Sequence, residues 1–200
     1  MAAKLLLASS NVGKLKEFRS LAPGAPISLE LELFPNFENI PAFEEAAPTF
    51  AENSLGKALY YSQYTNELVI ADDSGLAVPS LEGRPGVRSA RYAGENATSA
   101  QRMDKLLAEM KGNQGEKRAA HFTCAISVVK ENRALAVVTA RVDGEILQAQ
   151  RGAGGFGYDP IFYFPLLNKT FAELTAEEKN EHSHRGKAFR RLLAVLPDVL

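Results

Sequence analysis

Residues 68–76 read LVIADDSGL, in which two adjacent aspartates follow a short apolar run. We interpret residues 68–71 as a buried strand and the residues after Asp72 and Asp73 as a turn. Side chains alternate between the two faces of a strand, so both acids cannot enter one cleft while the strand continues. Sites gather at strand ends in α/β proteins, and a carboxylate there is suited to hold a hard cation such as Mg²⁺. A solvated Asp-Asp-Ser turn is the alternative.

Hydrophobic periodicity along the chain predicts a mixture of strands and helices. The predicted strands are residues 4–8, 27–33, 68–71, 118–129 and 133–147, the last two forming an antiparallel pair joined near residues 131–132. The predicted helices are residues 14–21, 49–64, 98–111 and 183–196, with capping boxes at Thr49 and Thr175. Strand–helix units beside a long antiparallel pair indicate an α/β fold with a mixed sheet. No linker divides the chain, so we expect residues 1–200 to form one domain.

The composition limits the classes of function. The 23 basic and 24 acidic residues leave a net charge of −1, so no global positive field attracts nucleic acid. The apolar run at residues 5–8 is too short for a signal peptide or a membrane span. The one cysteine, Cys124, can form no internal disulfide, and its apolar surroundings indicate a small buried hydrophobe. A free thiol without bridges suits a reducing compartment, and we expect a cytoplasmic protein.

The loop SSNVGK, residues 9–14, lies between the first predicted strand and the first predicted helix. Its members are Ser9, Ser10, Asn11, Val12, Gly13 and Lys14. Hydroxyls, an amide, backbone N–H groups and a lysine at a helix N-terminus together suit an anion such as phosphate. The loop does not match the Walker A pattern, and an ordinary capped turn is the alternative.

A second set of candidates consists of acids from two distant segments. Glu44 or Glu45 lies in a proline-bounded loop, and Asp72 or Asp73 follows the predicted strand. Carboxylates from such segments can share one Mg²⁺ and leave positions for water and substrate phosphates. Acids that only keep a surface loop soluble are the alternative.

The segment GGFGYDP, residues 154–160, is a candidate base-binding loop. Its glycines allow the backbone to approach a ligand closely. Phe156 or Tyr158 could stack on a planar base, and Asp159 could accept a hydrogen bond from a base N–H. A tight loop with two core aromatics is the alternative.

The last candidates are the basic residues before and at the start of the final predicted helix. They are Lys179 and the segment Ser183-His184-Arg185. Cations at a helix N-terminus oppose the helix dipole, so they suit a docked anionic or carbonyl-bearing ligand better than helix stability. A solvated basic turn is the alternative.

Together these segments resemble the inosine/xanthosine triphosphate pyrophosphatases, also called non-canonical purine NTP pyrophosphatases. The resembling stretches are LLLASSNVGKLKEF (5–18), TFAENSLGKA (49–58), IADDSGLAVPSLEGRPGVRSARYAGE (70–95), GGFGYDPIF (154–162) and EEKNEHSHRGKAF (177–189). They follow the family's order and cover essentially the whole chain. The departures are small: Ser9 stands where many members have Thr, and the loop at Glu44-Glu45 lacks a glycine that relatives often have.

The resemblance implies a fold and a reaction. The fold would be an elongated mixed sheet with flanking helices and two lobes around a central cleft, usually as a homodimer. The reaction would be the hydrolysis of ITP, dITP or XTP to the monophosphate and pyrophosphate with Mg²⁺. The protein would thereby remove deaminated purines from the nucleotide pool.

The resemblance also implies residue roles. The loop from Ser9 to Lys14 would bind phosphate, and Glu44 and Asp73 would bind the metal. Asp73 would also accept a proton, and Lys14 would absorb the negative charge on the departing pyrophosphate. These two residues are therefore the catalytic candidates. Further substrate contacts would come from Lys57, Ser74, Phe156, Gly157, Tyr158, Asp159, Lys179, His184 and Arg185.

Two other functions stay open. A Maf-type pyrophosphatase for pyrimidine or modified nucleotides would have a related architecture, although the SHR and GGFGYDP segments disfavour it. An inactive nucleotide-binding sensor is disfavoured by the full set of acids and cations. No serine in these motifs has an evident base beside it, so we favour attack by water over a covalent intermediate.

Overall fold

The computed structural model describes residues 3–200 and contains one seven-stranded sheet. Its strands are β1 (Ala3–Leu7), β2 (Leu29–Leu33), β3 (Leu68–Ala77), β4 (Ala119–Lys130), β5 (Arg133–Ile146), β6 (Phe162–Phe164) and β7 (Lys169–Thr170). Their order is β2-β1-β3-β4-β5-β6-β7. β1 pairs in parallel with β2 and β3, whereas β6 is antiparallel to β5 and β7. The predicted α/β fold with a mixed sheet is confirmed.

Five α-helices flank the described sheet. They are α1 (Val12–Leu21), α2 (Phe50–Ser62), α3 (Ser99–Glu109), α4 (Ala176–His182) and α5 (His184–Val199). Across residues 3–200, no helix has both the length and the apolar character needed to cross a membrane.

The chain forms two compact units. The first unit contains the described residues up to Asp73, together with Cys124–Ala140 and Ser183–Leu200, and the second contains Ser74–Thr123 and Arg141–His182. β3, β4 and β5 contribute residues to both units. Each of the three buried apolar clusters lies wholly within one unit, so each unit has its own core.

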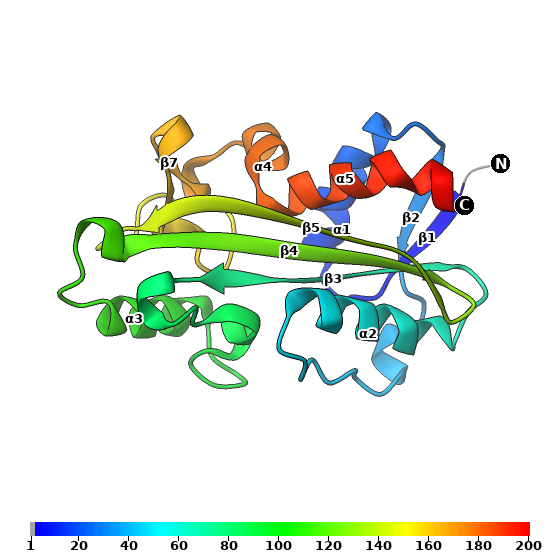
Figure 1. The fold of residues 1–200 in the computed structure, drawn as a ribbon, viewed down its shortest axis with the longest axis horizontal. Helices are drawn as coiled ribbons and strands as arrows, with labels where there is room; N and C mark the ends of the chain where they lie inside the picture. Colours follow the sequence, from blue (N-terminus) through cyan, green and yellow to red (C-terminus); the bar gives the residue numbers. More distant parts are fainter. Residues whose placement is uncertain (1–2) are drawn as a thin grey trace. The chain divides into compact units, whose positions relative to one another are not determined.

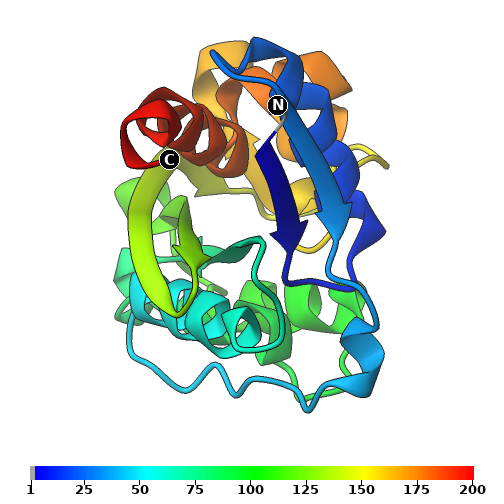
Figure 2. The same ribbon diagram turned by 90° about the vertical axis from the view of Figure 1, so that its right-hand side faces the viewer.

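In the first unit, helices cover both faces of β1 (Figures 1 and 2). Leu5 and Leu7 pack in the cluster that includes α1 and α5, while Leu6 and Ala8 pack in the cluster that includes α2. All four side chains are buried. A parallel strand covered on both faces needs apolar residues at every position, which explains this unbroken apolar run.

The second unit has an aromatic core. Phe122, Phe162 and Phe171 pack against one another with ring centroids 4.7 to 5.8 Å apart, a favourable range for aromatic pairs. α3 supplies Met103 and Leu106 to the same cluster. The cluster also buries Tyr158, which anchors the glycine-rich loop to this core.

The predicted caps and the predicted hairpin are largely confirmed. Thr175 and Glu178 form a reciprocal capping box before α4. Thr49 caps α2 through the N–H of Glu52, although the Glu52 carboxylate accepts from the Thr49 hydroxyl rather than from its backbone. Residues 131–132 both have positive φ, as a two-residue hairpin turn requires, so β4 and β5 are antiparallel. α1 begins at Val12 rather than at residue 14, since Asn11 caps it.

The prediction of a turn after the two aspartates is wrong. β3 continues through Asp72 and Asp73 as far as Ala77. The two acids are 1 % and 7 % exposed. A buried carboxylate needs compensating charges or hydrogen bonds, and here these come from segments distant in sequence. The local sequence therefore indicated a turn where long-range contacts support a strand.

Candidate functional site

β3 directs its two aspartates to opposite faces of the sheet. Asp72 continues the face of Ile70, which packs in the cluster with α1 and α5. Asp73 continues the face of Ala71, which packs in the cluster with α2. This separation follows from the alternation of side chains along a strand. The two acids consequently have different partners, although both belong to the first unit.

The Asp72 carboxylate is held between two cations. Lys14 Nζ donates to Asp72 Oδ1 at 2.9 Å, and Arg185 Nε donates to Asp72 Oδ2 at 3.4 Å. Burial alone would raise the pKa of Asp72, but Lys14 and Arg185 outweigh it and hold that pKa well below its usual range. Asp72 is therefore ionised whenever the protein is folded near neutral pH.

Arg185 is enclosed by acids at the start of α5. Its Nη1 donates to Glu17 Oε2 at 2.7 Å, and its side chain is 3 % exposed. Burial alone would lower the pKa of Arg185, but Asp72 and Glu17 raise it. These two acids offset the unfavourable position of a cation at a helix N-terminus, which the sequence analysis attributed to a ligand. Ser183 caps the same helix through the N–H of Gly186.

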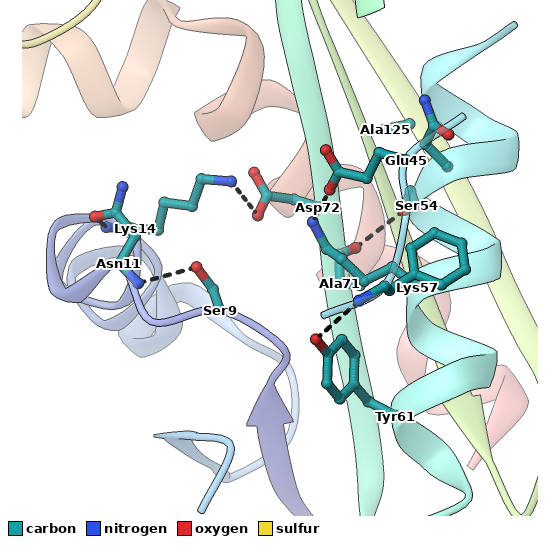
Figure 3. A network of polar contacts seen from close by, with 12 residues as sticks. Ser9, Asn11, Lys14, Glu45, Ser54, Lys57, Tyr61, Ala71, Asp72 and Ala125 are labelled. Atoms are coloured by element: carbon teal, nitrogen blue, oxygen red, sulfur yellow. Dashed lines mark hydrogen bonds and ion pairs between the residues drawn. The ribbon is translucent and has the colours of Figure 1, made fainter. Parts of the chain in front are cut away.

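The loop before α1 has the features of an anion site. Asn11 Oδ1 accepts from the N–H of Lys14 and Ser9 Oγ accepts from the N–H of Asn11, both at 3.1 Å. Residues 10–13 are exposed. Figure 3 shows Lys14 extending from the first turn of α1 to Asp72 on β3. A lysine, exposed backbone and a helix N-terminus therefore meet at the predicted phosphate loop.

Asp73 is compensated far less than Asp72. Its Oδ2 is buried and has no hydrogen-bond partner among residues 3–200, whereas the Asn53 side chain hydrogen-bonds to the carboxylate. Burial, followed by the negative charge of Glu45, raises the pKa of Asp73 to about 6. A buried carboxylate in this state attracts a proton or a cation.

Glu45 is the second carboxylate of this network. Lys57 Nζ donates to Glu45 Oε1 at 2.5 Å (Figure 3), and the Lys57 and Glu45 side chains are 12 % and 27 % exposed. The charge of Lys57 acts on both Asp72 and Asp73. Glu44, which we predicted as the metal ligand, is exposed. Glu45 is thus the acid of this pair whose charge acts on Asp73.

Glu45 and Asp73 fit a divalent cation that takes few protein ligands. Mg²⁺ typically binds one or two carboxylates and completes its shell with water and substrate phosphates. The unsatisfied Oδ2 of Asp73 is the kind of oxygen that such an ion would satisfy. The part of the chain that the structure describes has no group of three or more His, Cys, Asp or Glu arranged to hold a metal. Such an ion would complete its shell with ligands beyond these two carboxylates.

The predicted base-binding residues gather in the second unit. Lys179 Nζ pairs with Asp159 Oδ2 at 2.6 Å and lies 4.7 Å from the centre of the Phe156 ring. The N–H of Phe156 donates to the same Asp159 oxygen at 2.8 Å. Gly155 has a φ of +71°, and a Cβ there would collide with Asp159 Oδ2. The loop is therefore folded tightly around a buried carboxylate.

The two aromatic residues of this loop have different environments. Phe156 is 48 % exposed, whereas Tyr158 is 4 % exposed and its hydroxyl donates to the Ser89 carbonyl at 3.0 Å. Burial raises the pKa of Tyr158. Phe156 is therefore the aromatic with an accessible ring, and Tyr158 is a core residue. Ser74 and Gly157, also predicted to contact substrate, are half-buried.

The structure sorts the predicted residues into two groups. Those of the first unit are the loop 9–14, Glu44, Glu45, Lys57, Asp72, Asp73, His184 and Arg185, and those of the second are Ser74, Phe156, Gly157, Tyr158, Asp159 and Lys179. Two residues of the site, Glu17 and Asn53, were not predicted. Glu17 follows Lys14 by three positions on α1 and Asn53 precedes Lys57 by four on α2, so helical spacing was the available signal.

Comparison with known proteins extends over nearly the whole chain. The profile of the Ham1 family matches residues 5–195. A dITP/XTP pyrophosphatase of Geobacillus kaustophilus is 48 % identical over 189 residues, covering 94 % of this chain and 92 % of that protein. A dITP/XTP pyrophosphatase of Gloeobacter violaceus is 49 % identical over 190 residues, covering 95 % of this chain and 92 % of that protein.

Solved structures agree with the sequence matches. A HAM1 protein from Coxiella burnetii has a TM-score of 0.88 and 38 % identity, covering 98 % of this chain and 99 % of that one. The Ham1 protein of Staphylococcus aureus has a TM-score of 0.85 and 39 % identity, covering 98 % of each chain. The resemblance inferred from the five sequence stretches is confirmed, and the chain belongs to the Ham1 family.

Proposed function

We propose that this protein hydrolyses the non-canonical purine nucleoside triphosphates ITP, dITP and XTP to the monophosphate and pyrophosphate. The relatives named dITP/XTP pyrophosphatase support this substrate class. The observation that carries the reaction is the buried Asp73 Oδ2, which lacks a hydrogen-bond partner within the described chain. Glu45 and Lys57 lie in the same network. A carboxylate in this setting is suited to accept a proton or to bind a cation.

We propose that Glu45 and Asp73 hold a divalent cation, Mg²⁺, with Glu45 in the place that the sequence analysis assigned to Glu44. Bound Mg²⁺ would neutralise phosphate charge and lower the pKa of a bound water molecule. Repulsion from Glu45 contributes to the raised pKa of Asp73, so a cation shared by the two acids would favour the ionised form of Asp73.

The chain's own residues would supply the remaining chemistry. Asp73 orients the attacking water and accepts its proton. Lys14 and Lys57 stabilise the negative charge that grows on the departing pyrophosphate. The exposed loop at residues 10–13 binds phosphate oxygens at the N-terminus of α1. Breaking the bond between the α and β phosphorus atoms then yields the monophosphate and pyrophosphate.

The second unit's group is proposed to recognise the purine base. The exposed ring of Phe156 offers a stacking surface, and Asp159 and Lys179 hold the loop that carries it. Hypoxanthine and xanthine present a 6-oxo acceptor, whereas adenine presents a 6-amino donor. A buried donor aimed at the 6-oxo group would remain unsatisfied with adenine, at about 1–3 kcal/mol per group.

We also propose a cytoplasmic homodimer without a nucleic-acid partner. The free Cys124 thiol fits a reducing compartment. Burial raises the pKa of this thiol to about 12, so it is protonated and unreactive. The net charge of −1 provides no general attraction to nucleic acid. The homodimer is what the family resemblance implies.

A panel of triphosphates tests the proposed function. The protein is incubated with dITP, XTP, dATP, dGTP or dCTP, with Mg²⁺ or with EDTA, and the products are separated by anion-exchange chromatography. We expect dIMP or XMP with pyrophosphate, and only in the presence of Mg²⁺. Release of dIDP and orthophosphate would contradict the cleavage position, and a preference for dCTP would contradict the substrate class. Tight binding without turnover would indicate a nucleotide sensor instead.

A further inference from the structure

Four charged residues of the first unit form a continuous chain of contacts, from Lys14 through Asp72 and Arg185 to Glu17. Asp72 Oδ1 accepts a hydrogen bond from Lys14 Nζ at 2.9 Å, and Asp72 Oδ2 accepts one from Arg185 Nε at 3.4 Å. Glu17 Oε2 accepts a hydrogen bond from Arg185 Nη1 at 2.7 Å. They come from three elements, since Lys14 and Glu17 lie on α1, Asp72 on β3 and Arg185 on α5. Two positive and two negative charges balance, which allows Asp72 and Arg185 to be almost fully buried.

The two carboxylate oxygens of Asp72 have different partners. Arg185 binds Oδ2 and is itself held by Glu17, so the carboxylate plane has a fixed support on the α5 side. The other oxygen, Oδ1, is then directed at Lys14. Arg185 is suited to this task because its planar guanidinium can bridge two carboxylates, which an ammonium cannot do with the same rigidity.

Lys14 is the only one of the four that also borders the exposed phosphate loop. Its side chain is 18 % exposed, compared with 1 % for Asp72. An ammonium has three N–H donors, so a single bond to Asp72 leaves capacity for phosphate oxygens. A lysine already held in one rotamer loses less conformational freedom when a substrate binds, and it is in place when charge develops.

We propose that Asp72 is a positioning residue that aims the Lys14 ammonium at the phosphate loop, with Arg185 and Glu17 as its support. This inference rests on the proposed function, because it assigns Lys14 to the triphosphate. It also gives Arg185 a supporting role in addition to the substrate contact implied by the family resemblance. In this role Arg185 supports Asp72, and Asp72 acts through Lys14.

A double-mutant cycle tests the proposal. The variants are Asp72→Asn, Lys14→Met and the double variant, each assayed for kcat and KM with dITP and Mg²⁺. We expect Asp72→Asn to lower kcat by about ten- to a hundredfold, and by less than about threefold when Lys14 is already Met, because coupled residues are non-additive. Losses that multiply independently would overturn the proposal and leave Asp72 a purely structural acid.

A second readout does not depend on turnover. The acetylation of Lys14 by limiting acetic anhydride is measured by mass spectrometry, with the exposed Lys16 as internal reference. In the native protein Asp72 shields Lys14, so Asp72→Asn should increase the labelling of Lys14 several-fold relative to Lys16. Unchanged labelling would overturn the proposal. If the native protein releases no pyrophosphate but labelling responds as expected, the proposed function fails and the contact assignment survives.

Two further variants separate positioning from folding. Arg185→Lys keeps the buried positive charge and removes the guanidinium that contacts both Asp72 and Glu17. If Asp72→Asn shows no cooperative thermal transition, Arg185→Lys is used in its place in the cycle. It should lower kcat only when Lys14 is present.

The matched control is Glu32→Gln, which breaks the lysine–carboxylate pair Lys4–Glu32, also at 2.9 Å but exposed. Glu32→Gln should change kcat less than twofold, and an equal loss in both pairs would contradict the proposal.

Discussion

Asp72 and Asp73 are neighbours in sequence, yet the two faces of β3 give them opposite electrostatic environments. Lys14 and Arg185 overcompensate Asp72 and hold its pKa well below the usual range, whereas burial and Glu45 raise the pKa of Asp73 to about 6. Because side chains alternate along a strand, one dipeptide can supply both a permanent anion and an unsatisfied carboxylate. Two carboxylates whose pKa values are pushed apart in this way typically have different roles.

The largest expected contrast is in catalysis. Asp73→Asn removes the proton acceptor and one of the two proposed metal ligands, so we expect kcat to fall by about a hundredfold to ten-thousandfold. The measurement is pyrophosphate release from dITP at saturating Mg²⁺. Residual activity above a tenth of the native rate would remove Asp73 from the mechanism.

The next contrast is in the free energy of unfolding. Asp72→Asn leaves the buried Arg185 and its neighbour Lys14 without their shared anion, so we expect a loss of about 3–5 kcal/mol. The lowered pKa of Asp72 means that its stabilising effect is present above about pH 4 and is lost as the pH falls further. Urea unfolding at pH 7 and at pH 3 measures both the loss and its decrease. A loss below about 1 kcal/mol at pH 7 would show that the network is not a structural support.

Asp73→Asn should have the opposite effect on stability. The pKa of Asp73 is raised from 3.8 to about 6. Above pH 6 the ionised carboxylate therefore destabilises the metal-free folded state. Below about pH 4 the carboxyl group is protonated and this destabilisation is absent. The variant should therefore be more stable than the native protein at pH 8 in EDTA, by up to about 3 kcal/mol, and equally stable at pH 4. Urea unfolding at these two pH values gives the comparison. Destabilisation at pH 8 would contradict the environment described for Asp73.

A smaller contrast concerns the two glutamates of the loop before α2. Glu45 pairs with Lys57 and acts on Asp73, whereas Glu44 is exposed. Glu45→Gln should weaken Mg²⁺ binding by about tenfold, and Glu44→Gln should change it less than twofold, since an exposed acid contributes little. Calorimetric titration with Mg²⁺ in the presence of dIMP and pyrophosphate measures both. The reverse ranking would restore Glu44 as the ligand.

The amino-acid sequence determined most of the local structure and the chemical inventory. Apolar runs, capping residues and the turn at residues 131–132 predicted the α/β elements, because these signals act over a few residues. The motif-bearing stretches also identified Lys14, Asp73 and the glycine-rich loop as candidates. The choice of these residue types reflects phosphate and cation chemistry that does not depend on the exact packing.

Only the tertiary structure decided which charges neutralise one another. The strand through Asp72 and Asp73 depends on Arg185, which is 113 residues from Asp72, and local propensity cannot register such a partner. Glu45, and not Glu44, joins the network of Asp73 because the Lys57 side chain of α2 contacts it. Burial removes the water that would otherwise solvate these carboxylates, so each neighbouring charge or hydrogen-bond donor, or its absence, shifts their pKa values strongly. The roles of these acids therefore depend on the folded environment and not on their sequence.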